Sequence, residues 1–277
     1  MSDNKASFTA LATAYMRAVH QLLDTKPLLF DDPVALPLLG PEASQNIQDT
    51  AEHYQTPEVL ALRTRIILRS RFTEDRLAAA VSRGISRYII LGAGFDTFAL
   101  RQPSWAKKLK IVEVDHSGTQ SLKRSYIETA GFTVPENVIF ADINLENESL
   151  HEGLHRHNIS TDKPAFFSWL GVMMYLKEEA IDAVLNSVAM FPEGSEIVLT
   201  FVRPPGNSTS IIAQSVANLG EPWLSHFEPG EIEAKLRSAG FSQVEFLTPV
   251  DAETRYFRLR PKDLPVPEQT NILSAIR

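Results

Sequence analysis

The chain has 277 residues, of which 44% are hydrophobic and 22% are charged, so it can form a sizeable core and is not a wholly disordered protein. It contains no cysteine, which excludes disulfide bonds, thiolate metal sites and cysteine nucleophiles. The net charge of −7 argues against nucleic acid as a partner.

The first third of the chain carries helical patterns. Apolar residues recur at helical spacing over residues 7–25, and the prolines of residues 27–41 then predict turns and short helices. A second helix is predicted from Pro57, with Thr56 as a candidate N-cap, and Gly84 ends it.

Short apolar runs begin at Tyr88 and have the pattern of buried parallel strands. They cover residues 88–91, 110–114, 138–140, 165–170 and 196–202. Helical patterns between and after them cover residues 118–130, 178–190 and 231–239. Because buried strands alternate with helices, we expect an α/β fold with a parallel sheet covered by helices on both faces.

The last two runs, residues 243–248 and 255–259, have no helix between them and are expected to form an antiparallel pair at the sheet edge. The chain then divides into an N-terminal helical lid over residues 1–84 and a ligand-binding α/β domain over residues 85–277. We find neither a secretory signal nor an apolar stretch long enough to span a bilayer. We therefore expect a cytoplasmic protein that does not act at a membrane.

A glycine turn follows the first predicted strand, with the sequence Leu-Gly-Ala-Gly-Phe-Asp-Thr at residues 91–97. The ligand of an open α/β sheet binds beyond the carboxyl ends of the strands, and glycine lets the backbone approach it closely. Thr97 stands where a dinucleotide fingerprint needs its third glycine. The turn therefore favours a ligand without pyrophosphate, such as S-adenosylmethionine, over nicotinamide or flavin cofactors.

Acidic residues close the next two strands. Asp115 can accept hydrogen bonds from both hydroxyls of a ribose, and Glu113 is a competing candidate that falls in mid-strand. Asp142 can accept a hydrogen bond from an adenine amino group while Ile143 packs on the ring. Each aspartate also has a structural alternative, since Asp115 can cap the following helix and Asp142 can be a solvated loop residue.

The end of the fourth strand, within residues 166–176, is where cofactor and acceptor are expected to meet. The Tyr175 hydroxyl can point into the site, which makes Tyr175 a candidate catalytic residue. Trp169, Met173 and Met174 are expected to form an apolar wall or a part of the core.

At these residues the chain resembles the leucine carboxyl methyltransferase family, a group of class I S-adenosylmethionine-dependent methyltransferases. The motifs that carry the resemblance are Arg17-Ala18, Asp31-Asp32-Pro33, Arg69-Ser70-Arg71, Glu74-Asp75, Leu91 to Thr97, Glu113-Val114-Asp115, Gly171 to Leu176 and Gly240-Phe241. The resemblance implies a Rossmann-like class I methyltransferase fold with a mostly parallel seven-stranded sheet, and S-adenosyl-L-methionine as the cofactor.

The resemblance also implies roles for the residues at the strand ends. Gly92 and Gly94 would pass the methionine part of the cofactor. Asp115 would bind the ribose, and Asp142 with Ile143 would bind the adenine.

An arginine before the first strand grips the cofactor carboxylate in this family. Arg69 and Arg71 both fit that place, and Arg71 is the favoured candidate. His116, directly after Asp115, is expected to be a neighbour of the cofactor rather than a base. One departure is Leu170, because the family usually has glutamate there, so a cofactor contact is lost or supplied by another group.

The activity implied is methyl transfer to oxygen by direct displacement. A small-molecule carboxylate is the first candidate acceptor, because it is ionised at pH 7 and needs no general base, and a hydroxyl group is the second. His226, after the fifth strand, is a further candidate catalytic residue, and Arg203 could pair with an anionic substrate. The other histidines show no metal-ligand arrangement, so no metal site is expected.

Three alternatives stay open from the sequence. The acceptor could be the C-terminal carboxylate of a protein, although long recognition insertions are hard to find. A nucleotide-binding dehydrogenase is opposed by Thr97, and a non-catalytic S-adenosylmethionine-binding protein is kept open by Leu170. We expect a monomer or a homodimer that acts on a small molecule.

Overall fold

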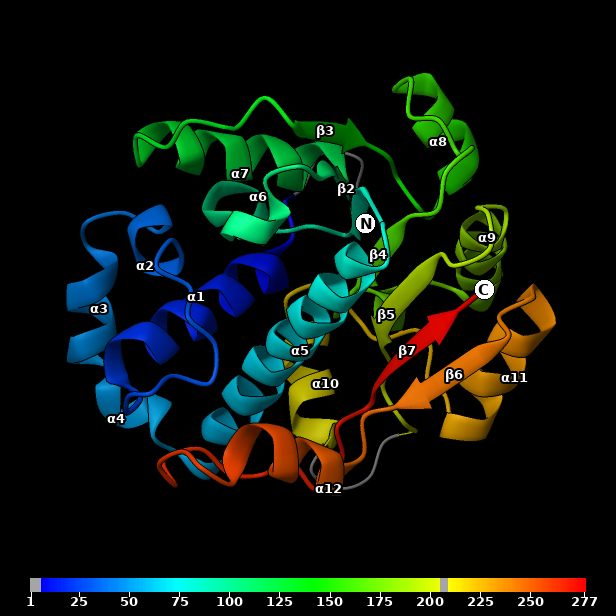
Figure 1. The fold of residues 1–277 in the computed structure, drawn as a ribbon. Helices are drawn as coiled ribbons and strands as arrows, with labels where there is room; N and C mark the ends of the chain where they lie inside the picture. The colour runs from blue at the N-terminus through cyan, green and yellow to red at the C-terminus, as the bar shows by residue number, and fades with distance from the viewer. Residues whose placement is uncertain (1–5, 205–208) are drawn as a thin grey trace.

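The computed structural model describes residues 6–204 and 209–277. Its centre is a seven-stranded sheet with the order β3-β2-β1-β4-β5-β7-β6 (Figure 1). Strands β1 to β5 run parallel to one another, whereas β7 runs antiparallel to both β5 and β6. The strands are β1 (Arg87–Leu91), β2 (Lys110–Asp115), β3 (Val138–Asp142), β4 (Phe166–Trp169), β5 (Glu196–Thr200), β6 (Gln243–Phe246) and β7 (Ile272–Ile276). The mostly parallel Rossmann-like sheet is therefore confirmed.

Helices surround this sheet. They are α1 (Phe8–Leu23), α2 (Ala35–Leu38), α3 (Ala43–Asp49), α4 (Ala51–Tyr54), α5 (Pro57–Ser82), α6 (Phe98–Arg101), α7 (Ser117–Thr129), α8 (Leu150–Arg156), α9 (Glu178–Ala189), α10 (Thr209–Asn218), α11 (Pro229–Ala239) and α12 (Pro249–Ala252). None of the helices in the described part of the chain combines the length and the apolar character needed to cross a membrane.

The apolar runs form buried strands because helices cover both faces of the sheet. Strands β4 and β5 are buried along their whole length. One face packs against α8, α9 and α11 through Leu154, Val184 and Leu236, and the other packs against α5 through Ile67 and Leu77. This two-sided packing leaves the carboxyl ends of the parallel strands available for a ligand.

The strand predicted at residues 255–259 is wrong. Residues Glu253–Phe257 form a π-helical turn that continues α12. Phe257 is buried in the core, while Arg255 and Arg258 are exposed, so the segment packs through one side of a helix. The antiparallel partner of β6 is instead β7, which inserts between β5 and β6.

The N-terminal helices are built onto the sheet. Helix α5 crosses one face of it (Figure 1), and α1 packs against α2 and α5. Thr56 stands at the N-cap position of α5, although its side chain makes no capping hydrogen bond. At the start of α1, the Ser7 hydroxyl caps the helix by accepting a hydrogen bond of 3.1 Å from the Ala10 amide.

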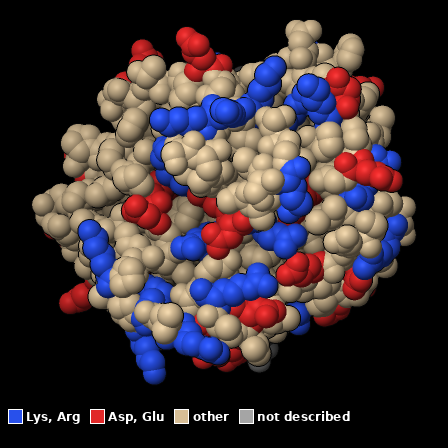
Figure 2. Space-filling model, in the orientation of Figure 1, with Lys and Arg blue, Asp and Glu red and all other residues tan. Residues whose placement is uncertain are grey.

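Figure 2 shows Lys and Arg side chains interspersed with Asp and Glu over the same face of the molecule.

Candidate functional site

A cavity of about 1010 Å³ lies at the carboxyl ends of the strands, beneath α1 and beside α5. Its volume is at the upper end of the range of about 300–1,000 Å³ for small-molecule sites. Its lining comes from the segments after β1, β2, β3, β4 and β5 and before β7, with one face each of α1 and α5. We call the part beside β1, β2 and β3 the first half, and the part beside β4, β5 and β7 the second half.

The glycine turn after β1 forms the floor of the first half. Gly92 has φ +65°, and a Cβ atom there would lie 2.3 Å from Cγ2 of Val172. Gly94 has φ +48°, and a Cβ atom there would lie 3.1 Å from that of Ala10 in α1. A larger residue at either position would strain the backbone and fill the space next to the cavity.

Asp115 ends β2 and lines the first half. Its Oδ2 accepts a hydrogen bond of 2.5 Å from the Gly94 amide, and its Oδ1 accepts one of 2.7 Å from the His116 amide. Burial raises the pKa of Asp115 above its ordinary value, against the effect of these two amides. Each carboxylate oxygen keeps a lone pair for a ligand hydroxyl.

Glu113, the competing candidate, does not line the cavity. It is buried beside Lys123, whose Nζ lies 2.5 Å from Oε2 of Glu113. His116 lines the cavity and caps α7, because its Nδ1 accepts a hydrogen bond from the Gly118 amide. The helix cap is therefore His116 rather than Asp115.

Arg71, the favoured candidate for a carboxylate ligand, lies outside the cavity. Its Nε donates to the exposed Asp75 at 3.0 Å, and its guanidinium stacks on the ring of Tyr256. Arg69 lines the cavity instead, because two residues along a helix point to different sides. Its guanidinium lies so close to the backbone after β4 that a Cβ on Gly171 would be 2.5 Å from Nη1.

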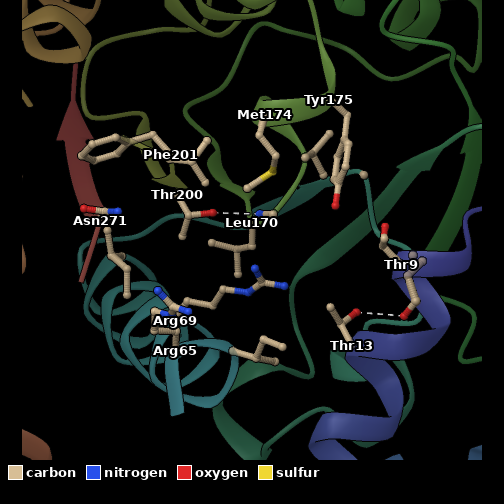
Figure 3. A pocket seen from close by; sticks show the side chains of 18 of the residues that line it. Thr9, Thr13, Arg65, Arg69, Leu170, Met174, Tyr175, Thr200, Phe201 and Asn271 are labelled. Carbon is tan, nitrogen blue, oxygen red and sulfur yellow. Dashed lines mark hydrogen bonds between the residues drawn. The ribbon is translucent and has the colours of Figure 1, made fainter. Parts of the chain in front are cut away.

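Arg69 makes no side-chain hydrogen bond or ion pair with any described residue. Burial lowers the pKa of its guanidinium to about 10, with a further contribution from the nearby charge of Arg17, while the carboxylate of Asp96 acts in the opposite direction. Leu170 directly precedes Gly171 and lines the cavity next to it (Figure 3). Since leucine replaces the expected glutamate, Arg69 has no carboxylate beside it at that position.

Asp142 also lies outside the cavity. Its side chain is half exposed and pairs with Nε2 of His157 at 2.7 Å and with Arg156. Ile143, the next residue, is buried and lines the first half, together with Asn144. Successive residues of an extended segment point to opposite sides, which places only one of Asp142 and Ile143 toward the ligand.

Of the two candidate catalytic residues, one lies at the cavity. Tyr175 lines it, and Figure 3 shows its hydroxyl pointing into the space between α1 and the segment after β4. His226 does not line the cavity; its ring packs near that of Trp223, with a centroid distance of 6.3 Å. Trp169 is wholly buried in the core, whereas Met174 reaches the cavity.

A buried polar network holds the glycine turn in place. Arg17 donates a hydrogen bond to the carbonyl of Phe95 and lies 3.4 Å from the carboxylate of Asp32. Asp32 in turn accepts a hydrogen bond of 2.6 Å from the Thr97 hydroxyl. The network joins Asp32 of the Asp-Asp-Pro motif to the glycine turn, although the two are far apart in the sequence.

Glu221 is a further residue at the site that the sequence analysis did not identify. Its carboxylate accepts hydrogen bonds from the amides of Phe8 at 2.7 Å and Thr9 at 3.2 Å, and from the Thr9 hydroxyl at 2.5 Å. A carboxylate at the start of a helix is stabilised by the free amides and the helix dipole. Glu221 therefore fastens the N-terminus of α1 over the cavity, and no local sequence pattern predicts a contact over this separation.

No group of three or more His, Asp or Glu side chains suited to a metal ion is found within residues 6–204 and 209–277.

Known proteins match both the sequence and the fold. The sequence pattern of the leucine carboxyl methyltransferase family matches residues 10–189. The Bacillus subtilis (strain 168) protein YktD, which is named as an S-adenosyl-L-methionine-dependent methyltransferase, is 30% identical over 100% of both chains. A protein of Parafrankia sp. (strain EAN1pec) with the same kind of name is 28% identical, over 77% of this chain and 68% of its own length.

Two solved structures share the fold. A protein from Thermobifida fusca YX, described as a methyltransferase, superposes with a TM-score of 0.60 at 18% identity, over 98% of this chain and 94% of its own. A DUF574 family protein from Streptomyces avermitilis MA-4680 also gives a TM-score of 0.60, at 15% identity, over 98% and 97% of the two chains.

Proposed function

Because this chain belongs to the leucine carboxyl methyltransferase family and is an S-adenosyl-L-methionine-dependent methyltransferase, we propose that it methylates an oxygen atom of a small molecule. The acceptor that we propose is a carboxylate. The observation that carries this choice is the chemistry of the second half of the cavity.

The first half of the cavity suits the cofactor. The glycine turn leaves the backbone open at Gly92, and the Asp115 carboxylate has lone pairs for the two ribose hydroxyls. Ile143 offers an apolar surface for the adenine. The free guanidinium of Arg69 is the group that would hold the carboxylate of the cofactor, at the junction of the two halves.

When bound, the cofactor would supply a methyl group on a positively charged sulfur. The acceptor oxygen would form a bond to the methyl carbon while the carbon–sulfur bond breaks and its electron pair stays on sulfur. The task of the protein is to hold the acceptor oxygen in line and to keep water out, an orientation effect of up to about 7–11 kcal/mol. Tyr175 is positioned to orient the acceptor, since its hydroxyl points into the cavity.

The second half is lined by apolar side chains and by arginines. Its apolar lining includes Leu170, Met174 and Phe201. Among the described residues that line it, the carboxylates are those of Glu58, Glu228 and Glu268, and all three are exposed to solvent. A hydroxyl acceptor would benefit from a buried general base, whereas an ionised carboxylate needs none.

The test begins with calorimetric titration of S-adenosylhomocysteine, with NAD as a control ligand. We expect S-adenosylhomocysteine alone to bind, and Asp115→Ala to lose most of the affinity. Asp142→Ala is the matched variant, because it removes the same group from the next strand end, and we expect a much smaller loss from it. Binding of NAD, or equal losses in the two variants, would contradict this assignment of the site.

The acceptor class is tested with methyl-labelled cofactor and a panel of carboxylic acids and phenols. A methyl ester releases its label as methanol in alkali, whereas a methyl ether does not. We expect alkali-labile product from the carboxylic acids. Alkali-stable label would make the acceptor a hydroxyl, and binding without transfer to any panel member would favour a non-catalytic protein.

A further inference from the structure

Three arginines line the cavity without a partner. The guanidinium groups of Arg65, Arg69 and Arg203 form no ion pair or hydrogen bond with any residue in the described part of the chain. The Nε atom of Arg203 is buried and has no hydrogen-bond acceptor among the described residues. An unpaired guanidinium that is partly removed from water destabilises the protein, so a ligand of this cavity is expected to carry more than one negative charge.

The three arginines are not equivalent in position. Arg65 and Arg69 lie one turn apart on the same face of α5, and Figure 3 shows both side chains reaching toward the cavity. Arg203 follows β5, where the Phe201 amide donates a hydrogen bond of 3.2 Å to the Asn271 carbonyl just before β7. Arg203 therefore belongs to the second half, Arg69 lies against Gly171 at the junction of the two halves, and Arg65 stands one turn from Arg69 on the same face of α5.

Burial is the cause that lowers the pKa of Arg65, and no neighbouring carboxylate offsets it. The cofactor carries one carboxylate, and Arg69 is the arginine at the junction of the two halves that makes no side-chain hydrogen bond, whereas Arg17 is held by Phe95 and Asp32. Arg65 and Arg203 are then left for the acceptor.

The reacting carboxylate is a poor ligand for these two arginines. Its negative charge disappears as the ester forms, so an ion pair with arginine would stabilise the ground state more than the transition state. An acidic group that keeps its charge through the reaction stabilises both states equally, and its binding energy can be used to orient the acceptor.

From this arrangement we propose that Arg65 and Arg203 form a subsite for a second, non-reacting carboxylate of the acceptor. The substrate is then a dicarboxylic acid that is methylated at one end only. The product is the monomethyl ester, because a second turnover would place a neutral ester against the two arginines. This inference rests on the proposed function, since it assumes transfer to a carboxylate.

The test compares matched acids by calorimetric titration in the presence of saturating S-adenosylhomocysteine. The dicarboxylates adipate, suberate and isophthalate are compared with the monocarboxylates hexanoate, octanoate and benzoate. One charge-assisted contact is commonly associated with roughly a tenfold to hundredfold change in affinity. We expect at least one dicarboxylate to bind with a preference of that size over its matched monocarboxylate.

The variants Arg65→Met and Arg203→Met are expected to abolish this preference and to leave the affinity for S-adenosylhomocysteine unchanged. Loss of an unpaired cation is not expected to unfold the protein, and thermal unfolding verifies this. Arg65→Lys, which keeps the charge, should retain part of the preference. Arg237→Met is the control, because Arg237 is exposed and pairs with Glu233 on α11.

Equal affinity for the two kinds of acid, or no binding of any dicarboxylate, would overturn the subsite. So would a preference that survives in both methionine variants. If S-adenosylhomocysteine fails to bind the unmodified protein, the proposed function itself is wrong. If it binds and monocarboxylates are esterified without a dicarboxylate preference, the proposed function stands and the subsite is excluded.

Discussion

Arg69 is the side chain on which the proposed orientation of the cofactor rests. It lies against the backbone at Gly171, between the glycine turn and the second half of the cavity. No described carboxylate forms an ion pair or hydrogen bond with it, although the charge of Asp96 acts on it favourably, and burial lowers its pKa to about 10, which leaves it charged at pH 7. A ligand carboxylate at this point would gain charge-assisted hydrogen bonds in a partly desolvated site.

We predict that Arg69→Met weakens S-adenosylhomocysteine binding by about 1.5–3 kcal/mol, or roughly ten- to a hundredfold. Methylthioadenosine lacks the amino acid part, so its affinity should be nearly the same in the variant and the unmodified protein. Calorimetric titration of both ligands measures the difference. A similar loss for the two ligands would mean that Arg69 supports the cavity rather than the cofactor carboxylate.

Arg71 is the matched comparison, because it stands two residues away and is paired with Asp75 at the surface. Arg71→Met is expected to affect neither ligand. If Arg71→Met weakened S-adenosylhomocysteine binding more than Arg69→Met does, Arg71 would be the ligand of the cofactor carboxylate, as expected from the sequence.

At the scale of elements, the glycine turn after β1 depends on its backbone conformation and on the space around it. A side chain at Gly92 would meet Val172, in the segment after β4. Gly84, which ends α5, also has a positive φ of +101°, but a Cβ there would meet nothing within 4 Å. Comparing a substitution at Gly84 with one at Gly92 therefore separates the cost of backbone strain from the cost of steric overlap.

We predict that Gly84→Ala lowers the free energy of unfolding by about 1–2 kcal/mol, the usual cost of the left-handed conformation. Gly92→Ala should lose about 1–3 kcal/mol more, because it also overpacks the contact with Val172. Denaturant unfolding measures both losses, and cofactor affinity should fall only in Gly92→Ala. Equal stability losses would show that the turn moves away from Val172 without cost.

Most of the elements could be predicted because their signals are local. Five buried apolar runs gave the parallel strands, and Pro57 and Gly84 bounded the long helix correctly within a few residues. The strand at residues 255–259 failed because an apolar pair flanked by charges fits one side of a helix as well as a strand. Strand β7 was missed because Ser274 and Ala275 interrupt its large apolar side chains.

The site was predictable where a residue's direction follows from its strand. Asp115, Ile143 and the two glycines line the cavity as expected. Arg71 and Asp142 lie outside the cavity, although Arg69, two residues away, and Ile143, the next residue, line it, because such a step turns a side chain to the other side of its element. Contacts between distant segments, such as that of Glu221 with α1, have no signature in the sequence.

At the scale of the whole molecule, α1 and the segment around Glu221 close the cavity together. Glu221 bonds the start of α1, and the neighbouring Leu224 amide donates a hydrogen bond of 2.7 Å to the carbonyl of Met174 in the cavity wall. Ser7 adds a hydrogen bond from its amide to the Thr119 hydroxyl, at the start of α7. A ligand in the first half would be covered by this assembly.

We predict that Glu221→Ala speeds the dissociation of S-adenosylhomocysteine, because the start of α1 loses its main fastening. The loss of a helix cap costs about 0.5–2 kcal/mol, which corresponds to a roughly two- to thirtyfold faster release if it acts only on the closed state. Stopped-flow displacement measures the rate, and Glu233→Ala, on the exposed side of α11, is the control. An unchanged rate would mean that the ligand leaves by a path that does not pass α1.

The insertion of β7 between β5 and β6 has a consequence for how substrates diverge among relatives. It brings residues 265–272 beside residues 200–204, and these two stretches form much of the wall of the second half. Both stretches lie beyond residue 189, where the match to the shared family pattern ends, while the cofactor-side residues lie within it. Two relatives can therefore inherit the same methyl-donor machinery and still differ in what they methylate. Exchanging these two stretches together between such relatives should transfer acceptor preference as a unit.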